Sequence, residues 1–204
     1  MKYWQKPGDA TTAVLKFYGE IHQWFNGAND FTTTLREIEV AGYVNLECRM
    51  HCYGGVVFEG NVIFNAIKDS KFTKKVCYVD GVAASMGSIV MLAFDEVIIA
   101  ENAFVMIHSP SGYVGGTSQD FFNMGKLLKS MQQNFSREYI RKTGKQQRDV
   151  DAWFDGSDHW FDANEAKSLG LVNAIASPVA VVADQNAKPD VNASIESVFN
   201  RFTA

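Results

Sequence analysis

The chain has 204 residues, of which 47% are hydrophobic and 21% charged, as in an ordinary globular protein with room for one sizeable core. A net charge of -4 and a pI near 5.6 argue against a nucleic-acid partner, which would require a basic patch. No apolar run reaches the length of a membrane span, the N-terminus lacks a signal-peptide pattern, and three cysteines without framework spacing suit a reducing cytoplasm.

Strands and helices are predicted to alternate through the first half of the chain. Residues 43–50 alternate apolar and polar side chains, the period of a half-buried strand. The apolar residues of 58–67 recur instead at helical spacing. The other predicted elements here are strands over 14–18, 76–79, 96–100 and 104–108, a helix opening at Asp30 or Thr32, and a helix over 85–92. This alternation indicates βαβ crossovers, a largely parallel sheet and therefore an α/β fold.

A long helix is predicted to follow the glycine-rich stretch 112–116. It opens near Thr117 or Ser118, with Asp120 in its first turn, and ends near Gly144. Its apolar residues form one stripe, which is either a packing face or a contact between subunits: Phe121, Met124, Leu128, Met131, Phe135 and Tyr139.

We expect one domain over 1–176, in which the polar segment 1–12 is mobile. Its last elements are a short helix over 163–169, closed by a glycine, and a strand over 171–175. Residues 177–204 are rich in Ala, Asp, Asn and Pro and are expected to be a linker with a short helix near its end. Such a tail would act as a tether or be removed by processing.

Three predicted strand ends carry residues suited to acyl transfer. Ser85 lies among small residues between a strand and a helix, where unpaired backbone N–H groups favour developing negative charge. Gly54 and Gly55 end an earlier strand, and paired glycines let backbone N–H groups approach a ligand. His108 ends a later strand. A lone serine in this setting is more often a helix cap, but a nucleophile, a base and a donor loop together indicate a hydrolytic site.

Cys48, His51 and Cys52 suggest a zinc site or a cysteine nucleophile. On a strand, the two cysteines would share a face but lie about 13 Å apart at ~3.3 Å per residue. They could not bind one zinc ion with bonds near ~2.3 Å, and His51 would lie on the opposite face. Buried thiols are the better interpretation.

In their order and spacing, these motifs resemble the proteolytic subunit of the Clp protease family. The resemblance runs from about residue 16 to 175. It is carried by Gly54-Gly55-Val56-Val57, by Gly81-Val82-Ala83-Ala84-Ser85-Met86-Gly87-Ser88, by Met106-Ile107-His108-Ser109-Pro110, by Thr143-Gly144, and by Asn164-Glu165-Ala166 with Gly170-Leu171-Val172.

The resemblance implies a role for individual residues. Ser85 corresponds to the family nucleophile and His108 to its general base, and the backbone N–H groups of Gly55 and Met86 correspond to the oxyanion hole. Counting back from the Gly-Leu segment, the triad acid falls on Asp158. Two nearby carboxylates compete for this assignment: Asp155 and Asp162. Neither a cofactor nor a metal is implied.

The implied fold is a ClpP/crotonase-like spiral of βαβ units. The glycine-rich stretch 112–116 and the long helix resemble the strand and helix of a protruding handle, through which family members pair their rings. The implied assembly is therefore a homo-oligomeric ring that cleaves proteins or peptides.

Within the family, the chain most resembles the ClpP-related head-maturation proteases of tailed phages, through residues 19–21, 78–81 and 101–103. This implies a serine endopeptidase of the bacterial host cytoplasm or the procapsid, acting on scaffold and capsid proteins. His51-Cys52-Tyr53 replaces the usual Asn-Ser-Pro, which implies a less rigid oxyanion loop. The segment before Val14 looks shorter than the loops that meet a Clp ATPase, which argues against that partner. The alternatives are a host-type ATP-dependent Clp subunit, a crotonase-like acyl-CoA enzyme, and an inactive shell component.

Overall fold

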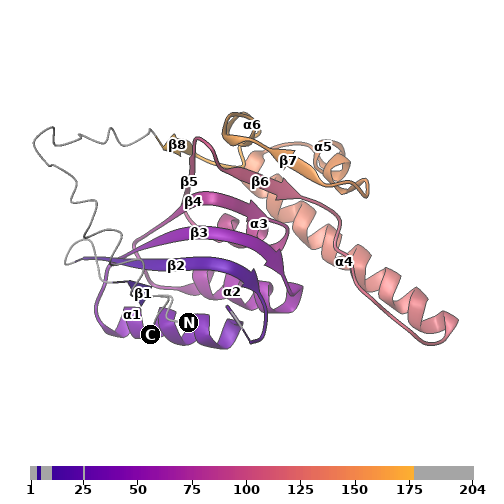
Figure 1. Cartoon of the computed structure of the whole chain (residues 1–204), viewed down its shortest axis with the longest axis horizontal. Helices are drawn as coiled ribbons and strands as arrows, with labels where there is room; N and C mark the ends of the chain where they lie inside the picture. Colours follow the sequence, from indigo (N-terminus) through magenta and orange to yellow (C-terminus); the bar gives the residue numbers. More distant parts are fainter. Residues whose placement is uncertain (1–3, 6–10, 25, 177–204) are drawn as a thin grey trace, which may run out of the picture.

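The computed structural model describes residues 4–5, 11–24 and 26–176 of the chain, as strands connected largely by helices (Figure 1). The strands are β1 (Trp4–Gln5), β2 (Thr12–Ile21), β3 (Asn45–Gly55), β4 (Lys74–Ala84), β5 (Glu96–Ala100), β6 (Phe104–Ile107), β7 (His159–Phe161) and β8 (Ala174–Ala176). The helices are α1 (Ala28–Val40), α2 (Val57–Asp69), α3 (Met86–Val90), α4 (Ser118–Thr143), α5 (Gln147–Asp151) and α6 (Ala163–Ser168), with 3₁₀ turns η1 (Met91–Ala93) and η2 (Ala152–Phe154).

The strands form one sheet in the order β1-β2-β3-β4-β5-β8, with β6 and β7 branching from β4. All neighbours from β2 to β8 along this order are parallel, so the predicted α/β fold is confirmed. Strand β4 changes partner along its length: Val76 pairs with Glu96 of β5, whereas Val82 pairs with Phe104 of β6. This fork brings the carboxyl end of β6 beside that of β4, which in turn pairs with β3.

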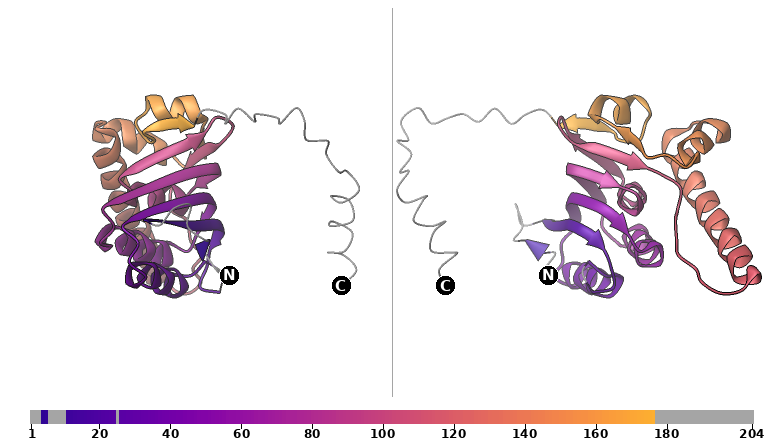
Figure 2. Two further views of the ribbon diagram at one scale, coloured as in Figure 1. Left: turned by 90° about the vertical axis from the view of Figure 1, so that its left-hand side faces the viewer. Right: turned by 45° about the vertical axis from the view of Figure 1, so that its right-hand side comes forward.

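The core lies between the sheet and the helices, which gather on one side of it (Figure 2). Alternate residues of β2 and β3, such as Leu15, Phe17, Cys48 and Met50, are buried, while those between them are half-buried. Because successive side chains of a strand face opposite ways, this alternation marks one face of the sheet as the core face. The buried side chains of this face hold the strands in place, and with them the carboxyl ends of the strands.

Helix α4 protrudes from the body of the molecule (Figure 1). It begins at a capping box in which Thr117 and Asp120 bond each other's backbone, and it ends at Gly144, whose φ is 70°. The predicted apolar stripe is divided in two. Its last residues, Phe135 and Tyr139, belong to the core, whereas Phe121 at the other end is exposed.

Several boundaries differ from those predicted. Helix α1 begins at Ala28, before Asp30, because the Glu59 carboxylate accepts a hydrogen bond from the Ala28 N–H. Strand β4 extends through the small residues to Ala84, because β6 pairs with its end. The helix predicted over 85–92 divides into α3 and η1, and the last strand lies at 174–176.

Other elements were not predicted at all: β1, α5, η2 and β7. Strand β1 lies within the segment 1–12 and pairs antiparallel with β2 at the edge of the sheet. Residues 112–116 pair with no strand in the described part of this single chain, and a Cβ at Gly112 would lie 3.5 Å from Met124 Sδ of α4. A handle strand that pairs with a second copy stays a prediction. The predicted tail over 177–204, with its helix, lies outside the described residues.

Candidate active site

Ser85 lies at the sharp turn between β4 and α3. Its N–H donates a hydrogen bond of 2.9 Å to the Met106 carbonyl, so the pairing between β4 and β6 extends to this residue. Its backbone has φ 53° and ψ -125°, and among the described residues it is one of two non-glycine residues with positive φ. Such a conformation costs roughly 1–3 kcal/mol and is retained mainly at functional sites.

Gly54 and Gly55 end β3 beside this turn. A Cβ at Gly54 would lie 2.6 Å from the Ser85 Cβ, and one at Gly55 would lie 2.1 Å from the Ile21 carbonyl oxygen. Only glycine fits these positions, whose φ angles are 94° and 137°. The segment 51–53, for which we expected a less rigid loop, instead lies within β3, where Cys52 pairs with β2 and β4.

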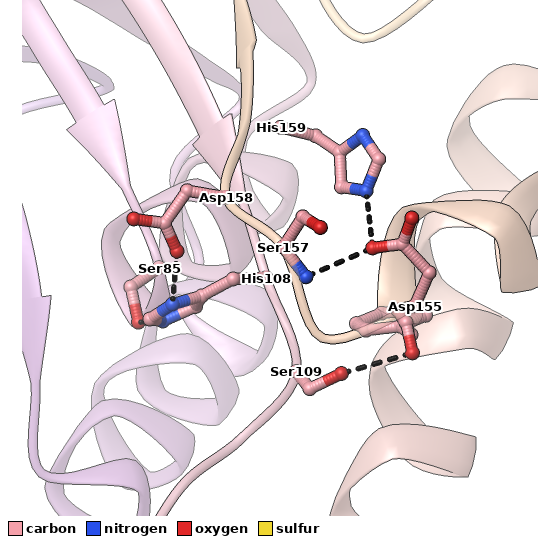
Figure 3. A network of polar contacts seen from close by, with 8 residues as sticks. Ser85, His108, Ser109, Asp155, Ser157, Asp158 and His159 are labelled. Carbon is pink, nitrogen blue, oxygen red and sulfur yellow. Dashed lines mark hydrogen bonds and ion pairs between the residues drawn. The ribbon is translucent and has the colours of Figure 1, made fainter.

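His108 follows β6 and joins Ser85 to Asp158 (Figure 3). Its Nε2 lies 2.7 Å from Ser85 Oγ, and its Nδ1 lies 3.1 Å from Asp158 Oδ1. Because a carboxylate only accepts hydrogen bonds, we assign the proton to Nδ1, which leaves Nε2 to accept from the serine hydroxyl. The structure thus brings together the three side chains that the sequence indicated.

The two competing carboxylates have other partners. Asp162 caps α6, accepting a hydrogen bond of 2.8 Å from the Glu165 N–H. Asp155 accepts hydrogen bonds from the Ser157 N–H and from His159 Nε2. Of the three candidates, only Asp158 contacts His108.

Strand β7 sets the position of Asp158, and no sequence pattern predicted this strand. It pairs antiparallel with β6, with Ile107 opposite His159, so that His108 and Asp158 lie next to each other just beyond the last pair. Three residues are too few to show a strand period. The aromatic run His159-Trp160-Phe161 after a glycine-containing turn was the available signal.

A cavity of about 230 Å³ lies next to the Ser85–His108 pair. Both predicted oxyanion donors, Gly55 and Met86, line it. Met86 is the first residue of α3, so its N–H lacks an acceptor within that helix. The remaining lining combines apolar residues with two hydroxyl-bearing ones and consists of Val57, Ile89, Pro110, Ser111, Phe135 and Tyr139.

A statistical model of the family described as Clp protease matches residues 26–179, well over half of the chain. The chain belongs to the Clp protease family. Among curated proteins it is similar to the ATP-dependent Clp protease proteolytic subunit 3 of Rhodococcus jostii (strain RHA1), being 29% identical over 140 residues that cover 68% of each chain. Among solved structures it is similar to a variant of ClpP1 from Listeria monocytogenes, with a TM-score of 0.70 and 28% identity over 81% of this chain and 92% of that one. The ClpP-like fold is confirmed.

In this Clp protease chain, helix α4 is tied to the nucleophile turn through a buried serine. Ser88 Oγ donates to the Ser85 carbonyl at 2.6 Å and lies 2.6 Å from the Tyr139 hydroxyl. Because the single Ser88 proton is used on Ser85, the Tyr139 O–H donates to Ser88. Burial raises the pKa of the Tyr139 hydroxyl well above its ordinary value, so it remains a neutral donor.

The cysteines of this Clp family member are free and buried, as predicted. Burial raises the pKa of the Cys52 thiol to about 12, which leaves it without nucleophilic thiolate at neutral pH. His51 contacts the rings of Tyr18 and Tyr53 instead. Among residues 11–24 and 26–176, no cluster of His, Cys, Asp or Glu is arranged to hold a metal ion. No helix in the described part of the chain is long and apolar enough to cross a membrane.

Proposed function

We propose that this protein is a serine endopeptidase in which Ser85 is the nucleophile, His108 the general base and Asp158 the residue that orients it. The observation that carries the proposal is the hydrogen-bonded chain from Ser85 Oγ through both nitrogens of His108 to Asp158. A crotonase-like acyl-CoA enzyme would share the architecture, but the family match and this hydrogen-bonded chain support a peptidase.

In the first half of the reaction, His108 Nε2 takes the Ser85 proton as Oγ attacks the peptide carbonyl. The N–H groups of Gly55 and Met86 stabilise the oxyanion, and each such donor contributes about 2.7–4 kcal/mol. Asp158 stabilises the imidazolium, which then protonates the leaving amine. In the second half, His108 deprotonates a water molecule that hydrolyses the acyl-enzyme ester and releases Ser85.

The cavity beside Ser85 suggests which substrates fit. Its walls include Val57, Ile89 and Phe135, and of these Ile89 and Phe135 are core residues with fixed packing. We therefore propose that it accepts an apolar side chain next to the scissile bond, since a charged one would lose its hydration there.

We further propose that the protein acts as a homo-oligomeric ring in phage head maturation, in the bacterial host cytoplasm or the procapsid. The support is the resemblance of residues 19–21, 78–81 and 101–103 to phage members. A protease that co-assembles with its substrates meets them at high local concentration and needs no unfoldase. A host-type subunit that works with an ATPase is the second candidate, because the Rhodococcus relative is named an ATP-dependent subunit.

The test has two arms. Peptides with an apolar or a charged residue before the scissile bond are incubated with the wild type and with Ser85→Ala. We expect cleavage of the apolar peptides by the wild type alone; equal turnover by Ser85→Ala would contradict the mechanism. In the second arm, scaffold and capsid proteins of the phage are added without ATP. Cleavage supports the maturation role, whereas cleavage only with a Clp ATPase and ATP supports the host-type role.

A further inference from the structure

A second carboxylate–imidazole pair, Asp155 with His159, lies beside the pair formed by Asp158 and His108 (Figure 3). We propose that Asp155 and His159 form a clamp that positions Asp158, so that His108 keeps the orientation it needs as a base. The inference rests on the proposed function, and it assigns these two residues a positioning role rather than contact with the substrate.

Asp158 requires external positioning because the sheet does not fix its side chain. The last pair between β6 and β7 joins Ile107 to His159, the residue that follows Asp158, so Asp158 itself lies outside the pairing. The Asp158 side chain is 58% exposed, and among the described residues its carboxylate bonds only His108. A carboxylate held by one partner in water has many competing rotamers, so its backbone must be fixed if the contact is to persist.

The clamp holds the residues on both sides of Asp158, one through its backbone and the other through its side chain. One oxygen of Asp155, Oδ1, accepts a hydrogen bond of 2.9 Å from the Ser157 N–H, and it lies 2.9 Å from His159 Nε2. These two donors belong to the residues immediately before and after Asp158. Gly156, with φ 99°, allows the chain to turn tightly enough for the carboxylate to reach both.

A further contact joins this turn to the strand that carries the base. Ser109 Oγ donates a hydrogen bond of 3.0 Å to the carbonyl of Phe154 (Figure 3). Ser109 follows His108 in sequence, and Phe154 precedes Asp155. This bond links Ser109, next to the base His108, to Phe154, next to Asp155. It therefore fixes the position of the turn relative to His108.

The side chains of Asp155 and His159 are partly exposed, so their positioning role can be distinguished from a contribution to stability. The side chains of Asp155 and His159 are 54% and 27% exposed, and ion pairs at such surface positions contribute little to stability. The Ser157 N–H and then His159 lower the pKa of the Asp155 carboxyl, so it is ionised at neutral pH. A clamp variant should therefore lose turnover while keeping its unfolding temperature.

The test compares kcat, KM and unfolding temperature for Asp155→Ala, Asp155→Asn, His159→Ala and His159→Gln. Asp155→Ala should lower kcat about ten- to a hundredfold, as for other groups that orient a catalytic side chain, with KM changed less than about twofold. Asn keeps an acceptor oxygen and Gln keeps a donor N–H, so both conservative variants should recover most of kcat. Asp149→Ala, which removes an exposed carboxylate paired with Arg148, is the matched control and should retain wild-type kcat.

The second measurement places Asp155→Ala in the Asp158→Ala background. If the clamp acts only through Asp158, the double variant should be no slower than Asp158→Ala alone. Wild-type kcat in both Asp155→Ala and His159→Ala, or losses that multiply in the double variant, would overturn the clamp. An inactive wild type that no serine-directed probe labels would instead overturn the proposed function.

Discussion

At the scale of single residues, Gly54 near the end of β3 packs closely against Ser85, which follows β4. The conformation of the nucleophile turn therefore depends on both strands. Gly54→Ala should slow the labelling of Ser85 by a serine-directed probe at least about tenfold, because a 1 Å shift of a reacting group has effects of that size. The new Cβ would lie 2.6 Å from the Ser85 Cβ and 2.8 Å from the Ala84 carbonyl oxygen.

Gly42 provides the control for this prediction. Its φ of 85° is close to the 94° of Gly54, but no atom lies within 4 Å of the position of its Cβ. Gly42→Ala therefore has similar backbone strain without the clash. Equal labelling rates in the two variants would contradict the steric account of the turn.

The triad residues should behave as one unit. His108→Ala should be nearly as damaging to kcat as Ser85→Ala, and the double variant little worse than either, because each removes the same proton transfer. Asp158→Asn should cost more activity than Asp155→Asn or Asp162→Asn, because only Asp158 contacts His108. Steady-state kinetics of the six variants check both statements; the reverse ranking of the carboxylates would assign the triad acid to another residue.

At the scale of elements, the C-terminal part of helix α4 supports the nucleophile turn through hydrogen bonds. The Tyr139 hydroxyl supports Ser88, which holds the carbonyl of Ser85. Tyr139→Phe should lower the free energy of unfolding by about 1 kcal/mol, the usual value for one hydrogen bond, and also reduce kcat. Urea unfolding and peptide hydrolysis measure the two effects. Tyr113→Phe, at a fully exposed tyrosine, is the control, and an equal loss there would contradict this role.

The same elements show what the sequence could and could not predict. Strands β2 to β6 and helix α4 were recognisable because each has a clear apolar period or a capping pattern such as Thr117 with Asp120. Strand β7 was not, because its three residues derive their conformation from pairing with β6. The Ser85–His108 contact followed from strand ends meeting at one edge of a parallel sheet. The choice among Asp155, Asp158 and Asp162 needed the structure, because it depends on which carboxylate β7 brings to His108.

At the scale of the whole molecule, the outer part of α4 leaves apolar side chains in water. Phe121 and Phe122 are 56% and 58% exposed, which is unusual for neighbouring aromatic residues on a protruding helix. We expect them to contact a second copy in the proposed ring. Phe135, which the sequence pattern grouped with Phe121, is buried in the core, so a charge there would unfold the chain rather than separate subunits.

Phe121→Asp should therefore reduce the assembly to smaller species without changing the far-ultraviolet circular dichroism. Light scattering across micromolar concentrations measures the mass, and Lys129→Asp is a charge-changing control on the same helix. A wild type that is monomeric throughout this range, or a Phe121→Asp variant with unchanged mass, would contradict the proposed contact.

The measurement that tests the central claim most directly is the site of covalent labelling by a fluorophosphonate. The wild type should gain one adduct per chain, located by peptide mass spectrometry on Ser85. His108→Ala should label at least about a hundredfold more slowly, as expected when a general base is removed, and Ser85→Ala should not label at all. An unlabelled wild type, or an adduct that persists in Ser85→Ala, would contradict the assignment of Ser85 as the nucleophile.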